Sequence, residues 1–281
     1  MLSRVLKNVL RDLAAYASRE TLTPQRLTEL ANAHAAQGQH AAAAGLYERA
    51  LRADPQYAAA HNNYALSLTA LGRLREAWAE SEWRFQLQEQ TRHFFAQAPI
   101  PRWRGEALPS GALVVLWEQG AGDMLQHLRF LPLAAERVRH LAFLCPEPLR
   151  RLVQASFPRL ELVRASAPVR WSDYAAFSPL LSLPHALGVH ERDLPDRPYL
   201  RAPEPAPGAS PAGVGIVWRA SDFDPARNCS LEDFSPLAAS GHALASLQTL
   251  ITPAERATLH AWRVQDLGSG FGDFLDTACA M

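Results

Sequence analysis

A short turn near the middle of the chain combines residues that could do chemistry. The segment EQGAGD, residues 118–123, follows the apolar run 113–117 and precedes a helical pattern. It places two carboxylates, Glu118 and Asp123, and several backbone N–H groups around one tight bend. Carboxylates can accept protons, and glycines let a ligand approach the backbone closely. A plain strand-to-helix turn needs only one glycine and a capping residue, so this pattern needs a further explanation.

Two common nucleotide-binding motifs do not fit this turn. Gly120 and Gly122 match the first two glycines of the dinucleotide fingerprint, but Leu125 stands where the third glycine belongs. The acidic residue that this fingerprint needs about 20 positions later is missing, because that region is Arg137 to Cys145. No Lys-Ser or Lys-Thr pair follows, which excludes a phosphate-binding P-loop. Dinucleotide binding is therefore disfavoured.

The sequence also lacks the usual patterns of metal ligands. Its ten histidines include no H-E-x-x-H motif, and its three cysteines, at positions 145, 229 and 279, include no C-x-x-C motif. The cysteines are also too few and too far apart for a disulfide framework. We therefore expect neither a metal nor a cofactor.

Composition excludes several classes of partner. The formal net charge is zero and the pI is about 7.2, which argues against binding to nucleic acid or to an anionic membrane. No run of about 18 apolar residues occurs, so no membrane span is expected. The amphipathic start carries Arg11 and Asp12, where a signal peptide would be apolar. These features predict a cytoplasmic protein.

The elements around the turn alternate between strand and helix patterns. Strands are expected at 113–117, 141–145, 160–163 and 174–177, and helices at 123–137, 147–156 and 179–187. After a Pro-rich bridge, a second series is expected: strand 214–218, helix 230–239, strand 244–248, helix 253–261 and strand 263–267. Such alternation is typical of parallel sheets, which bind ligands at the carboxyl ends of their strands. It predicts two parallel α/β lobes.

The first hundred residues contain an internal repeat. Gly72 follows Gly38 by 34 residues, and the same offset relates Ala31 to Ala65 and Ala43 to Ala77. Small residues at fixed helical positions, a glycine between two helices and a closing proline are the signature of the tetratricopeptide repeat. We predict two copies, 23–56 and 57–90, preceded by a helix over residues 2–19 and covered at the other end by something after residue 90.

Repeats of this kind usually present a groove to a peptide or protein. Asn62 and Asn63, with His61 beside them, are candidates to line the groove, because amide side chains can hold an extended peptide backbone. A solvated helix face explains the same residues equally well. The segment that follows is rich in proline, glycine and aromatic residues, and we expect these aromatics to pin the repeats to the next domain: Trp83, Phe85, Phe94, Phe95 and Trp103.

A series of motifs after residue 100 resembles a known group of proteins. The matching segments, in order, are PRW (101–103), GE (105–106), Leu108, Gly111, EQG (118–120), GD (122–123), Arg129, Pro132, PLLSLPHALG (179–188), VGIVW (214–218), SLQ (246–248) and DFLDTA (273–278). The order resembles bacterial tetratricopeptide proteins fused to a two-lobed, GT-B glycosyltransferase-like domain. That domain is similar to heptosyltransferases and, more distantly, to O-linked N-acetylglucosamine transferases. The likeness extends from about residue 24 to the last residue.

This resemblance implies a fold class and a set of domains. The class is α + α/β, with helical repeats followed by a GT-B-like domain. The expected limits are a cap and two repeats over 1–90, a connector over 91–111, a first lobe over 112–200, a hinge over 201–213 and an incomplete second lobe over 214–281.

The resemblance also implies a metal-independent transfer from a nucleotide sugar to a protein or glycan acceptor. Removal of a proton from the acceptor hydroxyl needs a base, and the proposed base of heptosyltransferases corresponds to Asp123. The alternative is that Asp123 caps the helix 123–137. Glu118 is better explained as a structural partner of a backbone N–H or of an arginine such as Arg129.

Other residues of both lobes are expected to contact donor or acceptor. In the first lobe these are Glu118, Gln119, Gly120, Gly122 and His127, although a lone histidine is more often a satisfied packing residue. In the second lobe they are Trp218, Arg227 and Ser230. Arg219-Ala220-Ser221 follows Trp218, where the group usually has a small residue and glycine.

The last helical pattern, DFLDTACAM, stops with the chain, before the segment that holds the donor pyrophosphate in the related proteins. We therefore expect that this chain as it stands transfers no sugar. The alternative function is a non-catalytic repeat scaffold for protein–protein interaction.

Overall fold

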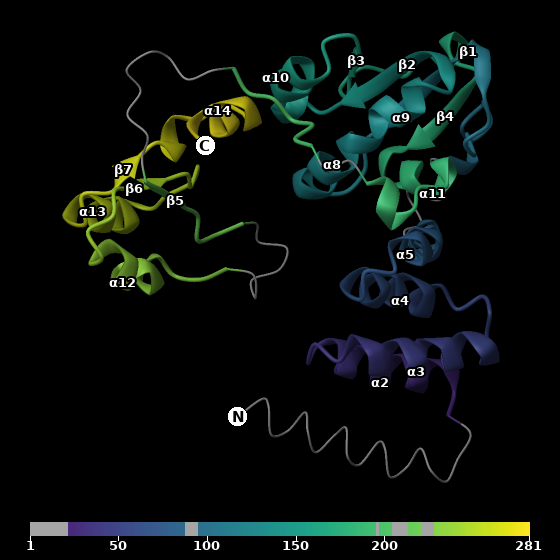
Figure 1. Ribbon diagram of the computed structural model, residues 1–281, viewed down its shortest axis with the longest axis horizontal. Coiled ribbons are helices and arrows are strands. Elements are labelled where there is room, and N and C mark those ends of the chain that lie inside the picture. The colour runs from purple at the N-terminus through teal and green to yellow at the C-terminus, as the bar shows by residue number, and fades with distance from the viewer. Residues whose placement is uncertain (1–21, 88–94, 195–196, 204–212, 221–227) are drawn as a thin grey trace. The chain divides into compact units, whose positions relative to one another are not determined.

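The computed structural model describes residues 22–87, 95–194, 197–203, 213–220 and 228–281 (Figure 1). The expected N-terminal helix, Phe94 and most of the Pro-rich hinge lie outside these residues. The chain divides into two units, one made of residues 1–142 and 168–196 and the other of residues 143–167 and 197–281. None of the described helices is long and apolar enough to cross a membrane.

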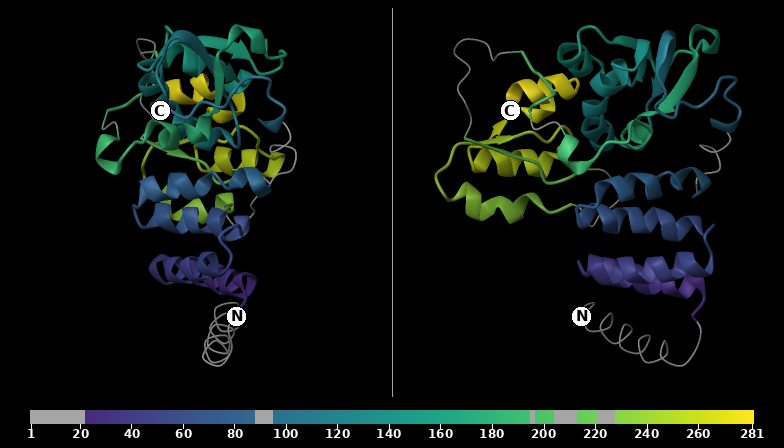
Figure 2. Two further views of the ribbon diagram at one scale, coloured as in Figure 1. Left: turned by 90° about the vertical axis from the view of Figure 1, so that its right-hand side faces the viewer. Right: turned by 45° about the vertical axis from the view of Figure 1, so that its right-hand side comes forward.

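The repeat region folds as two helix pairs, as predicted. Helices α2 (Pro24–Ala35) and α3 (His40–Ala53) form the first pair, and α4 (Ala58–Ala70) and α5 (Leu74–Ser81) form the second. Figure 2 shows the pairs stacked as successive layers. The two turns have the same backbone conformation, with φ of 74° at Gly38 and 75° at Gly72. Only glycine adopts this left-handed conformation freely, which explains its recurrence after 34 residues.

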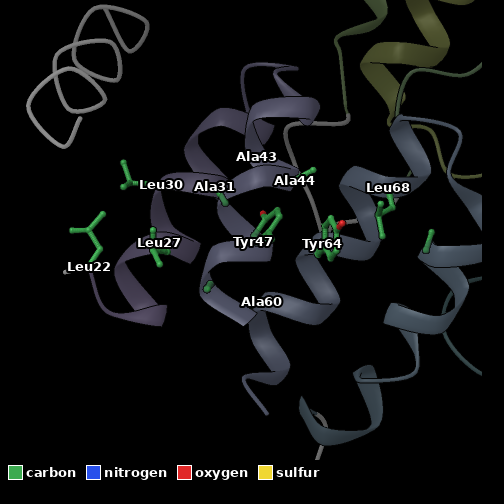
Figure 3. Packing of buried hydrophobic residues seen from close by; sticks show 12 residues of the cluster. Leu22, Leu27, Leu30, Ala31, Ala43, Ala44, Tyr47, Ala60, Tyr64 and Leu68 are labelled. Atoms are coloured by element: carbon green, nitrogen blue, oxygen red, sulfur yellow. The ribbon is translucent and has the colours of Figure 1, made fainter. Parts of the chain in front are cut away.

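Small residues hold the helices of each pair close together. The predicted positions Ala31, Ala43, Ala65 and Ala77 are all buried. Larger side chains fill the space between the pairs, where Tyr47, Tyr64 and Leu68 lie in one cluster (Figure 3). Because each pair buries its apolar face only against a neighbour, the cluster is continuous along the stack.

The second copy departs from the first in its second helix. Helix α5 ends at Ser81, and a separate turn, α6 (Arg84–Leu87), follows. The offset of 34 places Arg84 on Ala50, which is fully buried between helices in the first copy. An arginine cannot occupy that position because its long charged side chain would lose its water without a partner. The copy predicted to run to residue 90 therefore breaks after residue 81, and residues 88–90 lie outside the described part.

The first sheet has four strands in the order β3-β2-β1-β4. Their bounds are β1 (Leu108–Leu116), β2 (Val138–Cys145), β3 (Glu161–Arg164) and β4 (Ala176–Pro179), close to the four predicted strands. Strands β1 and β4 pair in parallel, with Leu113 opposite Ala176 and Leu116 opposite Pro179. Helix α10 (Glu147–Ser156) follows β2 as expected.

Three helices that were expected to be continuous are broken. The helix over 123–137 is instead α8 (Ala121–His127), a 3-10 turn η1 (Leu128–Phe130) and α9 (Leu131–Ala135). The helix over 179–187 is η3 (Leu180–Ser182) followed by α11 (Leu183–Leu187), and that over 230–239 is η6 (Leu231–Phe234) followed by α12 (Ser235–Ala238). Each break precedes a proline, at 132, 184 or 236. Proline has no N–H to donate to the carbonyl four residues earlier, so the preceding turn tightens.

The second sheet has three parallel strands in the order β5-β6-β7. They are β5 (Val214–Ile216), β6 (Leu244–Ser246) and β7 (Gln265–Asp266), each shorter than predicted. Helices α13 (Pro253–Ala261) and α14 (Phe274–Ala280) complete this part, and its core contains Ile216, Trp218, Leu231, Leu244, Leu259 and Val264. The chain is therefore of the α + α/β class, with helical repeats followed by parallel sheets.

The connector is pinned by aromatic residues, as expected. The ring of Phe95 lies 5.2 Å from that of Phe85 in the repeats and 5.7 Å from that of Phe177 in β4. Arg102 forms a parallel bridge with Phe177, and the backbone N–H of Trp103 donates to the carbonyl of Phe177. The connector thus lies along the outer edge of β4, and its aromatic rings link the repeats to the first sheet.

Candidate functional site

The EQGAGD turn follows β1, the strand at which the strand order of the sheet reverses direction. Strand β2, the next along the chain, lies on one side of β1, and β4 lies on the other. The carboxyl ends of β1 and β4 meet, since Leu116 is opposite Pro179. Open α/β sheets bind ligands at such switch points. Residues that follow β1, including the turn 118–123, and those that follow β4, including Ser182, are therefore the first candidates for a site.

Glu118 forms a buried ion pair with an arginine from the repeat region. Arg84 donates from Nε to Oε2 of Glu118 at 2.9 Å and from Nη2 to Oε1 at 2.7 Å. Both side chains are more than nine-tenths buried. The backbone N–H of Leu181 also donates to Oε1, at 3.1 Å. The expectation of a structural role with an arginine and a backbone N–H fits this geometry, but the arginine is Arg84, whereas Arg129 donates from Nε to the carbonyl of Gln126.

A wider network surrounds this pair. Arg84 also donates to Oγ of Ser182 at 2.8 Å, to the carbonyl of Ser81 at 3.0 Å and to the carboxylate of Glu82 at 3.0 Å. Arg102 donates to the same Ser182 hydroxyl at 2.8 Å and pairs with Glu82. Burial opposes charge on Arg84, but the hydrogen bonds and charge of Glu118 outweigh it and raise the arginine pKa. Every donor of the guanidinium fork therefore has a partner, as a buried charge requires.

The backbone is strained immediately after this anchor. Gln119 is exposed and has φ of 61°. This value lies in the left-handed region, which residues other than glycine, asparagine and aspartate rarely adopt. Such a conformation costs about 1–3 kcal/mol and persists only where the surroundings impose it. It lets the chain leave the buried Glu118 and enter α8 within two residues. Gly120 then takes the N-cap position.

Asp123 does not cap its helix. Helix α8 begins at Ala121, two residues earlier than predicted, and its cap, Gly120, has no side chain to offer. Asp123 is the third helical residue and is exposed. A Cβ on Gly120 would lie 3.4 Å from its Oδ2, whereas Gly122 faces open space. Among the described residues, none forms a hydrogen bond or ion pair with the Asp123 carboxylate. Capping is therefore not the explanation of this aspartate.

His127 lies one turn beyond Asp123 and is half-buried. Its Nδ1 is 2.8 Å from the carbonyl oxygen of Asp123, so Nδ1 carries the proton and donates. Burial lowers the pKa of His127, although the hydrogen bond to Asp123 opposes that shift. The imidazole is therefore neutral at pH 7, and its Nε2 is the acceptor nitrogen.

The amide side chains predicted to line a peptide groove already bond within the repeats. Asn63 donates to Oδ1 of Asn32 in the first copy at 3.0 Å, and the hydroxyl of Tyr47 donates to the same oxygen at 2.6 Å. Asn62 donates to Oδ1 of Asn63 at 3.4 Å. His61 is held on three sides: it pairs with Glu80, bonds the carbonyl of Pro55 and stacks on Trp83 with ring centroids 4.0 Å apart. The bond between Asn63 and Asn32 links the first helices of the two copies, and peptide binding by Asn62 and Asn63 stays a prediction.

The residues predicted in the second unit are at different depths. Trp218 is only 2% exposed, and its indole N–H donates to Glu255 at 2.7 Å. Burial would raise the pKa of Glu255, but hydrogen bonds from Thr252, Trp218 and Arg219 lower it to about 2. Ser230 precedes η6, and its backbone N–H donates to Asp233 at 2.8 Å. Arg227 lies outside the described residues.

The residues through which the repeats contact the segments after β1 and β4 were not predicted from the sequence. They are Arg84, Glu82, Ser182 and Glu191. Glu191 accepts a hydrogen bond from the backbone N–H of Arg75 at 3.0 Å, so it caps the start of α5. The rings of Trp78 and Phe130 pack in a T-shaped arrangement with centroids 5.8 Å apart. One signal was available, because an arginine at the offset position of a buried alanine needs a partner elsewhere. The predicted cover after residue 90 is formed by residues that follow β1 and β4.

Comparison with known proteins identifies the repeats. Residues 24–67 match the family model of the tetratricopeptide repeat. Protein FlbA of Caulobacter vibrioides (strain ATCC 19089 / CIP 103742 / CB 15) is 35% identical over 103 residues, which cover 35% of this chain and 17% of FlbA. The chain thus spans less than a fifth of that relative's length. In the described residues, no group of three or more His, Cys, Asp or Glu could hold a metal ion. Residues 24–67 are similar to a tetratricopeptide repeat, as the 34-residue offset predicts.

Proposed function

We propose that this is a tetratricopeptide-repeat protein with a glycosyltransferase-like α/β part of the GT-B type. The repeats bind a protein or peptide acceptor, and the α/β part, in its complete form, transfers a sugar from a nucleotide sugar to a protein or glycan hydroxyl. The observation that carries the proposal is the exposed carboxylate of Asp123, which lacks a partner among the described residues and follows β1 at the switch point of the sheet.

The chemistry assigned to this carboxylate is proton removal. As the acceptor oxygen bonds to the anomeric carbon, its proton passes to Asp123, and the nucleoside diphosphate leaves with the electrons of the broken bond. A carboxylate within reach of the acceptor hydroxyl can take that proton. Gly120 and Gly122 leave the surface next to Asp123 free of side chains, and the acceptor nitrogen of His127 is one helical turn away.

We also propose the domain limits that the resemblance implies: 1–90, 91–111, 112–200, 201–213 and 214–281. The compact units divide the chain differently, since residues 143–167 belong with the second unit. Arg151 of α10 explains this grouping, because it bonds both Asp273 and Asp276 at the start of α14, at 3.1 and 3.0 Å.

The test begins with calorimetric titration of a panel of nucleotide sugars into the chain and into longer forms that contain it. A form that binds one of them is then assayed for transfer. Asp123→Asn should lower the transfer rate by about 10²–10⁴-fold with little change in donor affinity, because it removes only the base. Glu136→Gln, at an exposed carboxylate before β2, is the matched control and should leave the rate unchanged. A loss below tenfold in Asp123→Asn would remove Asp123 from the mechanism.

A second candidate function is a non-catalytic scaffold for protein–protein interaction, and Arg84 favours it. The guanidinium of Arg84 bonds Glu118 after β1 and Ser182 after β4, so a residue of the repeats already occupies the position between these strand ends. If a folded chain and its longer forms bind no nucleotide sugar at millimolar concentration, this second function replaces the first.

A further inference from the structure

We propose that Arg84, a residue of the repeat region, is the positioning residue of the turn 118–123. The second repeat is then a structural part of the α/β site and not a separate module tethered to it. The inference rests on the proposed function only where it concerns the base Asp123. The hold of Arg84 on the turn is a property of the fold and can be tested by itself.

Glu118 is the one buried residue of the turn. Trp117 before it is 42% exposed, and Gln119, Gly120, Gly122 and Asp123 after it are exposed as well. The next buried side chain is Met124, inside α8. Burial of apolar surface therefore does not fix the backbone between residues 117 and 123. The path of the turn depends on what holds Glu118.

Arg84 holds this carboxylate by both oxygens. Its Nε and Nη2 bond the two oxygens of Glu118 side by side, which fixes the direction of the carboxylate as well as its position. The same Nη2 bonds Ser182 at 2.8 Å, and Leu181 donates to Glu118 from the backbone. The fork thus joins the residues after β1 to the residues after β4.

The guanidinium is itself fixed on the repeat side. Nη1 bonds the carbonyl of Ser81, the last residue of α5, and the carboxylate of Glu82. The carbon of the guanidinium lies 4.0 Å above the ring of Phe85. At the other end of α5, Glu191 caps the helix through the N–H of Arg75. Arg84 therefore transmits the position of α5 to the turn.

The left-handed residue shows that the turn is under constraint. Gln119, at φ 61°, follows the held carboxylate directly and is itself exposed. A glutamine that is free to relax leaves this region, because its Cβ crowds the backbone there. Loss of the fork should let residue 119 relax, and with it the start of α8 and Asp123.

Amide hydrogen exchange, followed by mass spectrometry on the full chain, measures this directly. In Arg84→Met, the amides of Leu181 and Met124, which donate to Glu118 and to the carbonyl of Gly120, should exchange at least about tenfold faster, since local opening loses the buried pair. The matched control is Arg102→Met. Arg102 belongs to the same network, but its bonds go to Glu82 and Ser182, whereas Arg84 holds Glu118. Loss of Arg102 should therefore change exchange of these amides by less than about threefold.

A second variant keeps the test decisive if Arg84→Met does not fold. Arg84→Lys retains the charge but not the two-pronged geometry, and exchange of the turn should rise to a value between those of the wild type and Arg84→Met. Unchanged exchange of the turn in a folded Arg84 variant, or an equal rise in Arg102→Met, would overturn the proposal. If the Arg84 variants exchange faster but the protein binds no nucleotide sugar, the absence of binding refutes the proposed function and the faster exchange still supports the positioning role.

Discussion

Three carboxylates of this chain show how surroundings decide the role of one chemical group. Glu118 is buried and held by a guanidinium, Asp123 is exposed with no partner among the described residues, and Glu255 accepts bonds from an indole, a guanidinium and a backbone N–H. The first and third are committed to structure, whereas the second is free to accept a proton. The role of a carboxylate in this chain therefore follows from its hydrogen-bond and ion-pair partners more than from its residue type.

Glu255 should make the stability of the second unit depend on pH. Its folded pKa of about 2 lies below its ordinary value of 4.5, so the carboxylate stabilises the fold fully above pH 4.5 and loses this contribution as the pH falls towards 2. Glu255→Gln should lower the unfolding free energy by about 1–3 kcal/mol at pH 7 and flatten its decline between pH 4.5 and 2. Urea unfolding at a series of pH values, followed by circular dichroism, measures both effects.

The control for that experiment is Glu232→Gln. Glu232 is exposed in the same unit and should leave the pH dependence as in the wild type. An acid decline that persists unchanged in Glu255→Gln would assign it to another group.

At the scale of elements, glycine and proline set where helices turn and break. Gly38 and Gly72 turn the repeats through the same backbone conformation, and prolines at 132, 184 and 236 shorten the helices of the α/β part. Both effects come from the backbone itself, because proline lacks a donor and glycine lacks a Cβ.

The two glycine turns should respond equally to substitution. Gly38→Ala and Gly72→Ala should each cost about 1–2 kcal/mol, because a Cβ at this φ crowds the carbonyl although no other atom lies within 4 Å. Gly45→Ala is the matched control: Gly45 is exposed within α3, also faces open space, and should gain about 0.5–1 kcal/mol from helix propensity. Denaturant midpoints measure all three. A gain at residue 38 or 72 would show that those turns are not left-handed.

At the scale of the whole molecule, the chain carries separate hydrophobic cores. Leu68 belongs to the core of the repeats and Leu259 to that of the second sheet, and the two clusters have no residue in common. In contrast, Arg84 comes from the repeat region and Glu118 follows β1 of the first sheet, and the two belong to the same unit. Cooperativity should follow these units more closely than the boundary between helical and α/β sequence.

Core substitutions should reveal the units. Leu68→Ala and Leu259→Ala should each cost about 2–5 kcal/mol, and their effects should add in the double variant to within about 0.5 kcal/mol, because they share no packing partner.

Arg84→Met and Glu118→Leu should be strongly non-additive, since either change alone leaves a buried charge unpaired. Calorimetric unfolding of the single and double variants measures the coupling. Additive costs for Arg84 and Glu118 would contradict the buried pair.

The sequence by itself determined the repeats and the order of strands and helices. The 34-residue offset is readable because helix pairs pack locally, so small residues and glycine recur at fixed positions. Strands β1 and β2 were predicted from the short apolar runs 113–117 and 141–145, which cover the carboxyl-terminal parts of the two observed strands. The prolines at 132, 184 and 236 also mark the helix breaks in the sequence, although the apolar pattern across them predicts continuous helices.

Only the tertiary structure decided which residues meet at the candidate site. From the sequence, Asp123 is the candidate base and Glu118 a structural partner of a backbone N–H or of an arginine such as Arg129. The structure makes Arg84 the arginine that holds the buried Glu118, and it leaves Asp123 exposed. In the sequence, Arg84 has the pattern of an ordinary helical residue. In the structure, α5 ends at Ser81, and Arg84 in the next turn does not pack in the repeat core. The partners of a charged side chain depend on elements brought together by the sheet order and by the packing of α5, and neither is encoded in local spacing. The fold therefore decided which charged side chains are paired at the candidate site and which are exposed. The periodic patterns that build the fold were already present in the sequence.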